Sequence, residues 1–279
     1  MIYDILGVSW KLVNFAHDYK CKRFLLVSLI NPWSFLHLIY LFSNMAIFNS
    51  DSNIRGYFWL PPVTKTLLIA NFAIYFLQRI FPPIESLFGL HYFESQLFSP
   101  FQTLTYMFLH GGFNHIFFNM FALFMFGRVI EQMLGKWRFL FYYAVCGVTA
   151  AAAQEIVWWL RMGSSIESLL YLNNLDFFTP AQMSTIYDMF ITIGASGAIF
   201  GLLLAFAVML PNQPIFLFFL PIPIKAKWFV GIYALLELME GIKVTNGDNV
   251  AHFAHLGGMI GGALLLWYWR REARRNLEF

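Results

Sequence analysis

Six long apolar stretches, separated by polar turns, dominate this sequence of 279 residues. They cover residues 66–81, 113–134, 138–160, 194–210, 227–242 and 250–269. A helix of about 20 residues crosses the ~30 Å hydrocarbon layer of a bilayer, and a helix satisfies its own backbone hydrogen bonds inside lipid. The pattern therefore predicts an all-α integral membrane protein with a bundle of six transmembrane helices.

The composition excludes an ordinary soluble enzyme. Hydrophobic residues make up 59% of the chain and charged residues 12%, whereas a soluble domain is nearer ~45–50% and ~25%. A disordered protein and a nucleic-acid binder are excluded on the same grounds. The two cysteines, Cys21 and Cys146, lie far apart in apolar surroundings and predict neither a disulfide framework nor a zinc site.

The distribution of lysine and arginine predicts how the core is oriented. If the first helix starts in the cytoplasm, the inner segments carry eleven of these residues, including the four arginines of 270–275. The outer segments then carry only three, Arg79, Arg161 and Lys243. Positive residues favour the cytoplasmic side, so both ends of the core are predicted to face the cytoplasm.

The first 55 residues do not fit this scheme. Residues 24–48 are apolar enough to span, but Asn31-Pro32 interrupts them, and proline disrupts a helix interior. The segment can be a seventh span, an interfacial segment, or sequence ahead of a true start at Met45. We therefore divide the chain into an N-terminal extension (1–55), a core (56–270) and a basic cytoplasmic tail (271–279).

The second predicted helix begins with polar residues that are costly to place in lipid. His115 and Asn119 are four residues apart and so lie above each other on one helix face, with His110 just before them. An isolated polar residue in a membrane helix often only bonds a neighbouring helix. Two stacked donors favour a functional interpretation.

The fourth predicted helix begins with Gly194-Ala-Ser196-Gly197. A serine in a membrane helix usually packs or bonds the preceding turn. The pattern is not the G-x-S-x-G elbow of soluble hydrolases, because Ala198 replaces the last glycine. However, the first turn of a helix has free N–H groups and a positive dipole end, which favour a developing oxyanion.

The sixth predicted helix contains two histidines, His252 and His255, followed by glycines. From His255, offsets of three and seven residues give Gly258 and Gly262, a small-residue face that lets helices approach closely. From His252 the same offsets give a histidine and a methionine, which would hold helices apart. If the glycine face packs against the fourth helix, His255 reaches Ser196 and can act as its general base.

The same histidines could instead ligate a metal. The sequence has no H-E-x-x-H motif, and no carboxylate accompanies the histidines on their own helix. We therefore expect neither a metal nor an organic cofactor. We assign four acidic residues near the ends of predicted helices to packing or to solvated rims: Glu131, Glu155, Glu237 and Glu240.

Together these motifs resemble those of the rhomboid family of intramembrane serine proteases. The resemblance covers about residues 63–269 and rests on three motifs in chain order: His110, His115 and Asn119; Gly194-Ala-Ser196-Gly197; and Ala-His-x-x-Gly-x-x-x-Gly around His255. A further stretch, Gly127-x-x-x-Glu131-x-x-x-Gly135, also looks like the family's pattern, and we interpret it as structural.

The resemblance implies a catalytic dyad without an aspartate, in which Ser196 is the nucleophile and His255 is the base and later the acid. The oxyanion hole would consist of the Ser196 backbone N–H and the side chains of His115 and Asn119. Structural support would come from one histidine and four glycines: His110, Gly194, Gly197, Gly258 and Gly262.

This sequence departs from the family in its outer loops and beside the histidine. The predicted first outer loop, residues 82–112, lacks the Trp-Arg pair of many members, and Phe200 stands where some relatives have tyrosine. The resemblance implies that Phe200 would still stack on the histidine ring. The outer loop 161–193 is long for the family, and we expect it to lie on the surface as short amphipathic helices.

The resemblance implies a multi-pass endopeptidase of a bacterial inner membrane. Its partners would be the lipid bilayer and membrane-protein substrates with unstable transmembrane helices; we expect no nucleic acid and make no prediction of oligomeric state. The alternative within the family is a catalytically silent protein that binds transmembrane clients. A transporter with a histidine proton relay is a third class, although no inverted repeat supports it.

The predicted orientation can be tested by chemical labelling. A cysteine placed after Phe279 should be shielded from an impermeant maleimide in intact cells, because the arginine-rich end of the core is expected inside. The same cysteine should react once the cells are lysed. Labelling before lysis would overturn the orientation and move the candidate site to the other face.

Overall fold

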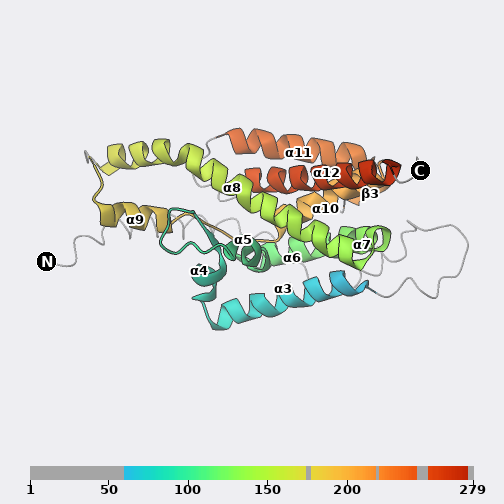
Figure 1. The fold of residues 1–279 in the computed structure, drawn as a ribbon, viewed down its shortest axis with the longest axis horizontal. Coiled ribbons are helices and arrows are strands. Elements are labelled where there is room, and N and C mark those ends of the chain that lie inside the picture. The colour runs from blue at the N-terminus through green and yellow to red at the C-terminus, as the bar shows by residue number, and fades with distance from the viewer. Residues whose placement is uncertain (1–59, 174–176, 218–219, 244–250, 276–279) are drawn as a thin grey trace, which may run out of the picture. The chain divides into compact units, whose positions relative to one another are not determined.

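A computed structural model describes residues 60–173, 177–217, 220–243 and 251–275 (Figure 1). The predicted N-terminal extension and the last four residues of the predicted tail lie outside the described residues. Within the described part, a helix covers each predicted span: α3 (Pro62–Ile80), the consecutive α6 (Phe113–Ala122), η4 (Leu123–Gly127) and α7 (Arg128–Leu134), α8 (Lys136–Asn173), α10 (Ser196–Met209), α11 (Ala226–Ile242) and α12 (His252–Arg275).

Two of these helical segments are long and apolar enough to cross a membrane, judged by length and composition: Phe113–Leu134 and Lys136–Gly163. The helix Ser196–Met209 is apolar but shorter. Large apolar side chains are exposed along α3 and α11, among them Phe76 and Ile232, as expected for faces that contact lipid. That all six segments cross a bilayer stays a prediction.

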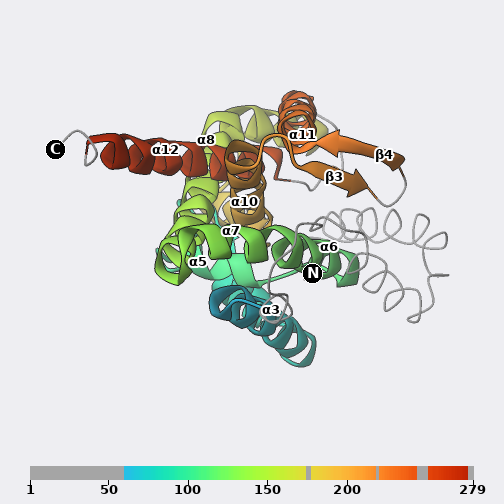
Figure 2. The same ribbon diagram turned by 90° about the vertical axis from the view of Figure 1, so that its right-hand side faces the viewer.

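Helices α8, α10 and α12 form the centre of the described bundle. Figure 1 shows α3 and α11 on opposite sides of these helices, and Figure 2 shows the same order from the side, with the β3–β4 hairpin beside α11. That hairpin pairs β3 (Pro214–Leu217) with β4 (Leu220–Lys225) in antiparallel fashion. The arrangement leaves α10 enclosed by its neighbours, and ten of its fourteen residues are buried.

Glycines on α10 and α12 bring the central helices together. A Cβ atom at Gly258 of α12 would overlap the Gly197 carbonyl oxygen of α10. A Cβ at Gly262 would overlap the Tyr142 hydroxyl of α8, which donates a 2.8 Å hydrogen bond to the Gly201 carbonyl. Any larger residue at these glycines would push the helices apart.

The outer loops contain short helices and one small strand pair. Helix α8 continues to Asn173, so residues 161–173 extend the third span rather than forming the expected surface loop. The reason is local, because no proline interrupts the sequence between 161 and 179. The expected short helix of this loop is α9 (Pro180–Asp188). A capping box at its start, in which Thr179 and Gln182 exchange hydrogen bonds, fixes that end.

The first outer loop folds against the second. It contains α4 (Ile84–Phe88), β1 (Leu90–His91), α5 (Gln102–Thr105) and η3 (Tyr106–Phe108). Strand β1 pairs in antiparallel fashion with β2 (Ile191–Thr192) of the other loop. The pairing ends two residues before Gly194, so it fixes the approach of the chain to the start of α10.

Glu131 of α7 caps the beginning of α3. Its carboxylate accepts hydrogen bonds from the backbone N–H groups of Val63 (2.9 Å) and Thr64 (2.6 Å), and from the Thr64 hydroxyl (2.7 Å). The N-cap position of α3 is Pro61, whose side chain makes no capping bond. Glu131 therefore satisfies free N–H groups that α3 cannot satisfy itself, which agrees with a structural role for the Gly127–Gly135 pattern.

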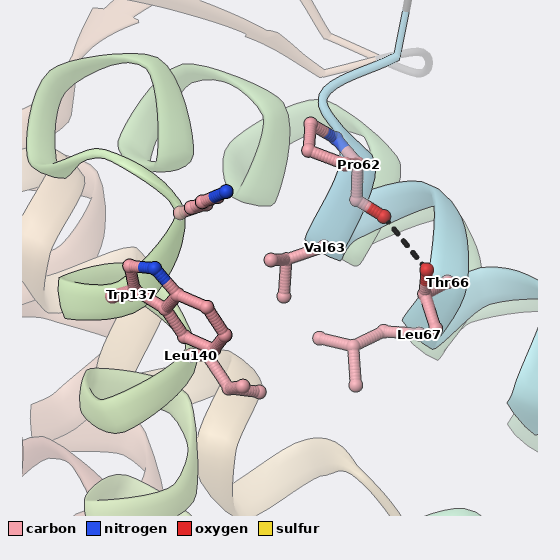
Figure 3. A pocket seen from close by; sticks show the side chains of 7 residues that line it. Pro62, Val63, Thr66, Leu67, Trp137 and Leu140 are labelled. Atoms are coloured by element: carbon pink, nitrogen blue, oxygen red, sulfur yellow. Dashed lines mark hydrogen bonds between the residues drawn. The ribbon is translucent and has the colours of Figure 1, made fainter.

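A cavity of about 230 Å³ lies close to this cap, between the start of α3 and the start of α8 (Figure 3). Its lining is mainly apolar: Pro62, Val63, Thr66, Leu67, Lys136, Trp137 and Leu140. The Thr66 hydroxyl is already bonded to the Pro62 carbonyl at 2.8 Å. The cavity thus has few polar groups that could bind a ligand, and none of the predicted catalytic residues lines it.

The Glu131 cap should contribute measurably to stability. Glu131→Ala removes all three hydrogen bonds and leaves two N–H groups unsatisfied, whereas Thr64→Val removes only the hydroxyl bond. We expect Glu131→Ala to cost at least about 2 kcal/mol and Thr64→Val about 1 kcal/mol, measured as midpoints of thermal unfolding in detergent. Equal midpoints for the two variants would contradict the assignment of the cap to Glu131.

Candidate active site

Ser196 is the first residue of α10. The backbone N–H groups in the first turn of a helix have no intrahelical partner, so the Ser196 amide is available at the positive end of the helix dipole. The chain reaches this position through Gly194, whose N–H donates to the Tyr106 carbonyl at 2.9 Å. The serine side chain is half-buried at the end of the bundle where α12 begins.

Gly194 is required by both conformation and space. Its φ angle is +135°, a region that residues with a side chain rarely adopt. A Cβ atom there would lie 2.7 Å from His115 Nε2 and 3.8 Å from Ser196 Oγ. The absent side chain thus lets the His115 ring approach the serine.

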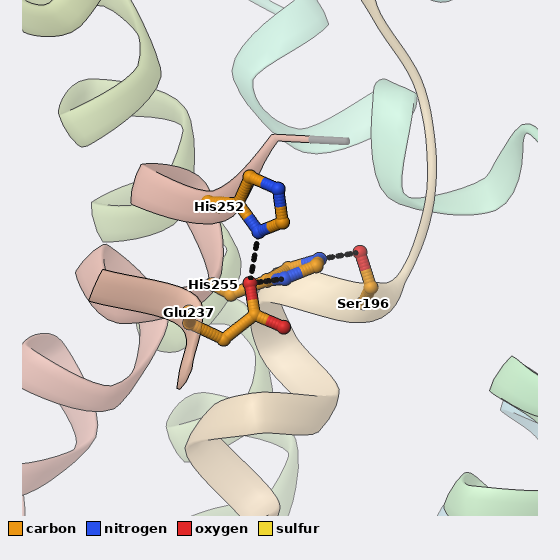
Figure 4. Close-up of polar contacts among 4 residues, drawn as sticks. All are labelled: Ser196, Glu237, His252 and His255. Atoms are coloured by element: carbon orange, nitrogen blue, oxygen red, sulfur yellow. Dashed lines mark hydrogen bonds and ion pairs between the residues drawn. The ribbon is translucent and has the colours of Figure 1, made fainter. Parts of the chain in front are cut away.

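His255 of α12 contacts the serine directly. Its Nε2 lies 2.8 Å from Ser196 Oγ (Figure 4). The ring of Phe200 stacks on the imidazole with centroids 4.2 Å apart and planes 6° from parallel, which confirms the expected stacking. His255 is only 8% exposed, so packing holds the ring beside the hydroxyl.

Glu237 of α11 joins the two histidines, which corrects its assignment to packing or a solvated rim. Its Oε2 lies 2.8 Å from His255 Nδ1 and 2.7 Å from His252 Nδ1 (Figure 4). The glutamate is 7% exposed. A sequence signal did exist, because an ionisable residue within a predicted membrane helix is a functional candidate by default.

The other two acids near helix ends have different surroundings. Glu155 Oε2 accepts a 3.0 Å hydrogen bond from the Phe93 backbone N–H of the first outer loop, so this glutamate ties the loop to α8. Glu240 forms a 2.6 Å ion pair with Lys243, in which both side chains are exposed. Glu240 therefore lies at a solvated rim, as expected.

The orientation of His115 places a donor beside the serine. Its Nδ1 accepts a 3.3 Å hydrogen bond from the Gly111 backbone N–H, so the proton of the neutral ring lies on Nε2. Nε2 of His115 points to the space where Gly194 has no side chain, because it is the atom that a Cβ at Gly194 would meet first. His115 can therefore donate a hydrogen bond toward the space next to Ser196.

Asn119 and His110 flank His115. Asn119 is buried on α6, and within the described residues its Nδ2 has no hydrogen-bond partner. A buried amide donor without a partner is costly and suits a group that bonds a transient oxyanion. The His110 ring contacts the His115 ring edge to face at 5.1 Å, and its backbone N–H donates to Gln78 Oε1 at 3.0 Å.

Three groups of the site have the chemistry of metal ligands. One ligand atom from each of Glu237, His252 and His255 lies within 4.8 Å of the others. Carboxylate and imidazole ligands of this kind suit zinc. The same atoms already form the hydrogen bonds between the glutamate and the histidines, and the expected lack of a metal stays a prediction.

Comparisons with known proteins agree with the motifs. The family model of the rhomboid domain matches residues 98–272. Rhomboid protease AarA of Providencia stuartii is 31% identical over 218 residues, which cover 73% of this chain and 70% of the relative. Rhomboid-like protein 11, chloroplastic, of Arabidopsis thaliana is 25% identical over 235 residues, covering 76% and 65%.

A third relative is rhomboid protease GluP of Bacillus subtilis, 32% identical over 160 residues, which cover 57% of this chain and 24% of the relative. The chain thus spans less than two thirds of two of these three relatives. The region matched by the family model contains all three polar motifs. This chain belongs to the rhomboid family, an all-helical family of integral membrane proteins that includes intramembrane proteases.

Proposed function

We propose that the chain is an intramembrane serine endopeptidase in which Ser196 is the nucleophile and His255 is the general base. The observation that carries the proposal is the 2.8 Å distance between Ser196 Oγ and His255 Nε2. A hydroxyl is a weak nucleophile until a base within hydrogen-bond reach takes its proton. The relatives named as proteases support the same reaction class.

Acylation follows from this geometry. Ser196 Oγ attacks the carbonyl carbon of the scissile peptide bond while its proton passes to His255 Nε2. The carbonyl oxygen becomes an oxyanion in the tetrahedral intermediate. The protonated His255 then gives its proton to the leaving amine, the carbon–nitrogen bond breaks, and the acyl group remains on the serine.

Deacylation repeats these steps with water. Nε2 of His255 takes a proton from a water molecule, whose oxygen attacks the acyl carbon. The intermediate collapses when the proton returns to Ser196 Oγ, which releases the new carboxyl terminus and regenerates the enzyme. Ser196 lies at one end of α10 and is half-buried, so we propose that water enters the site from this end.

The proposed oxyanion hole has three donors. The Ser196 N–H lies at a helix start, the His115 Nε2–H faces the same space, and the Asn119 amide has an unused donor in the described part of the chain. Preorganised donors of this kind stabilise the charge that develops in the transition state. The donor set favours a protease over a silent protein that only binds transmembrane clients.

We extend the proposal to substrate and location. Substrates are membrane proteins whose transmembrane helices unwind easily, because an extended backbone must reach the serine. Cleavage occurs near the outer face of a bacterial inner membrane, and both ends of the six-span core lie in the cytoplasm. The charge distribution supports this orientation.

The nucleophile is tested by Ser196→Ala. This variant should fold and insert but lose cleavage of a model transmembrane substrate, because the covalent route needs the hydroxyl. Labelling by a fluorophosphonate probe should disappear in parallel. Turnover above ~1% of the parent would contradict the assigned nucleophile.

The two histidines should differ in their effect. His255→Ala removes the ring that is hydrogen-bonded to Ser196, so cleavage and probe labelling should both vanish. His252→Ala should leave measurable activity, because His252 bonds the carboxylate of Glu237, whereas His255 bonds the serine. An essential His252 with a dispensable His255 would mean that α12 is one turn out of register.

The oxyanion role of Asn119 predicts a smaller loss. Asn119→Ala should lower turnover by ~10²-fold or less, as removal of a single oxyanion donor does, because two donors remain. The measurement is turnover at limiting substrate concentration, with detergent-solubilised protein of verified folding. Unchanged turnover would remove Asn119 from the oxyanion hole.

A further inference from the structure

We propose that Glu237 is a positioning residue for the reaction, which orients His255 of the Ser196–His255 dyad and balances its charge. The inference rests on the proposed function of Ser196 and His255. The carboxylate acts through the histidine and does not touch the serine. Three helices contribute one group each: α10 the serine, α12 the histidine and α11 the glutamate.

The positions of the ring protons carry the argument. An ionised carboxylate only accepts hydrogen bonds, so both imidazoles that contact Glu237 Oε2 must donate to it through Nδ1–H. A neutral His255 with its proton on Nδ1 has a lone pair on Nε2. That lone pair is the one that receives the Ser196 proton at 2.8 Å. Glu237 thus selects the tautomer in which His255 is a base.

The carboxylate also opposes the charge that forms during the reaction. When His255 takes the serine proton, its imidazolium is buried and stacked under Phe200. A buried cation without a counter-charge is costly. Glu237 Oε2 lies 2.8 Å from the ring and offsets this cost at the step where the cation appears.

His252 fixes the carboxylate from a second direction. Its Nδ1 lies 2.7 Å from the same oxygen that bonds His255, and the two rings are nearly perpendicular at 87°. An oxygen held by two donors from different directions has little freedom to turn away. His252 therefore supports the carboxylate and does not replace His255 as the base.

The alternative is that Glu237 merely ties α11 to α12. A glutamine is an uncharged analogue of nearly the same size that keeps an acceptor oxygen, so it preserves a tie but does not supply the charge. Glu237→Gln is therefore the informative variant, and Glu237→Asp is its partner because it keeps the charge on a shorter side chain. Glu240→Gln is the matched control, since it makes the same chemical change one turn later on α11, where the acid is exposed.

The measurements are kcat and KM for a model transmembrane substrate, the rate of Ser196 labelling by a fluorophosphonate, and the thermal midpoint. We expect Glu237→Gln to lower kcat and the labelling rate together, by at least about tenfold, with KM changed less than about twofold. The loss should stay below the ~10⁴-fold seen when a triad acid is replaced in soluble proteases, because Phe200 also orients the ring. Glu237→Asp should recover part of the rate, and Glu240→Gln should match the parent.

Three results would overturn the proposal: Glu237→Gln with the parent's kcat, equal losses in Glu237→Gln and Glu240→Gln, or no gain in rate from glutamine to aspartate. If Glu237→Gln does not fold, Glu237→Asp decides, and a folded aspartate variant without activity counts against the proposal. Ser196-dependent probe labelling of the parent distinguishes a failure of the proposed function from a failure of the Glu237 inference alone. Without such labelling the proposed function fails; with it, and with unchanged Glu237→Gln, only this inference fails.

Discussion

The close approach of α10 and α12 is the constraint on which the site depends. A Cβ atom at Gly258 would overlap the carbonyl oxygen of Gly197, so the two backbones touch at the residue after Ser196 and one turn after His255. A hydrogen bond of 2.8 Å between side chains on separate helices tolerates little displacement. Lipid tails are as apolar as the side chains, so burying apolar side chains between helices gains little free energy. Close packing of the backbones therefore contributes much of the stability of the helix–helix contact.

The polar groups next to Ser196 each have a hydrogen-bond partner or a proposed use, whereas both ring nitrogens of His110 lack a partner among the described residues. Glu237 bonds both histidines, Ser196 bonds His255, and the Asn119 amide keeps an unused donor among the described residues. Polar groups inside a membrane protein are expensive unless they bond one another. The concentration of such groups at one end of α10 and α12 thus distinguishes the site from the apolar cavity beside α3.

Much of the arrangement could be predicted from local patterns. The helices follow the apolar stretches, and the choice of His255 over His252 follows from the glycines at offsets of three and seven, which decide which face of α12 meets α10. The prediction of a loop from residue 161 was wrong for residues 161–173, because polar residues there suggest a loop, whereas the absence of proline lets α8 continue. Glu237 was missed because its partners lie on another helix, and a sequence does not reveal how α11 is rotated against α12.

Two glutamates that look alike in the sequence show why rotation matters. Glu131 and Glu237 are both buried acids in apolar helices, and each satisfies its carboxylate with donors from a neighbouring helix. The donors of Glu131 are two backbone N–H groups and a hydroxyl, which do not ionise near neutral pH, so we assign this carboxylate to holding α3. The donors of Glu237 are imidazoles, which can take up and release a proton on the second ring nitrogen. The chemical nature of the donors, rather than burial, therefore separates the structural role of Glu131 from the positioning role that we propose for Glu237.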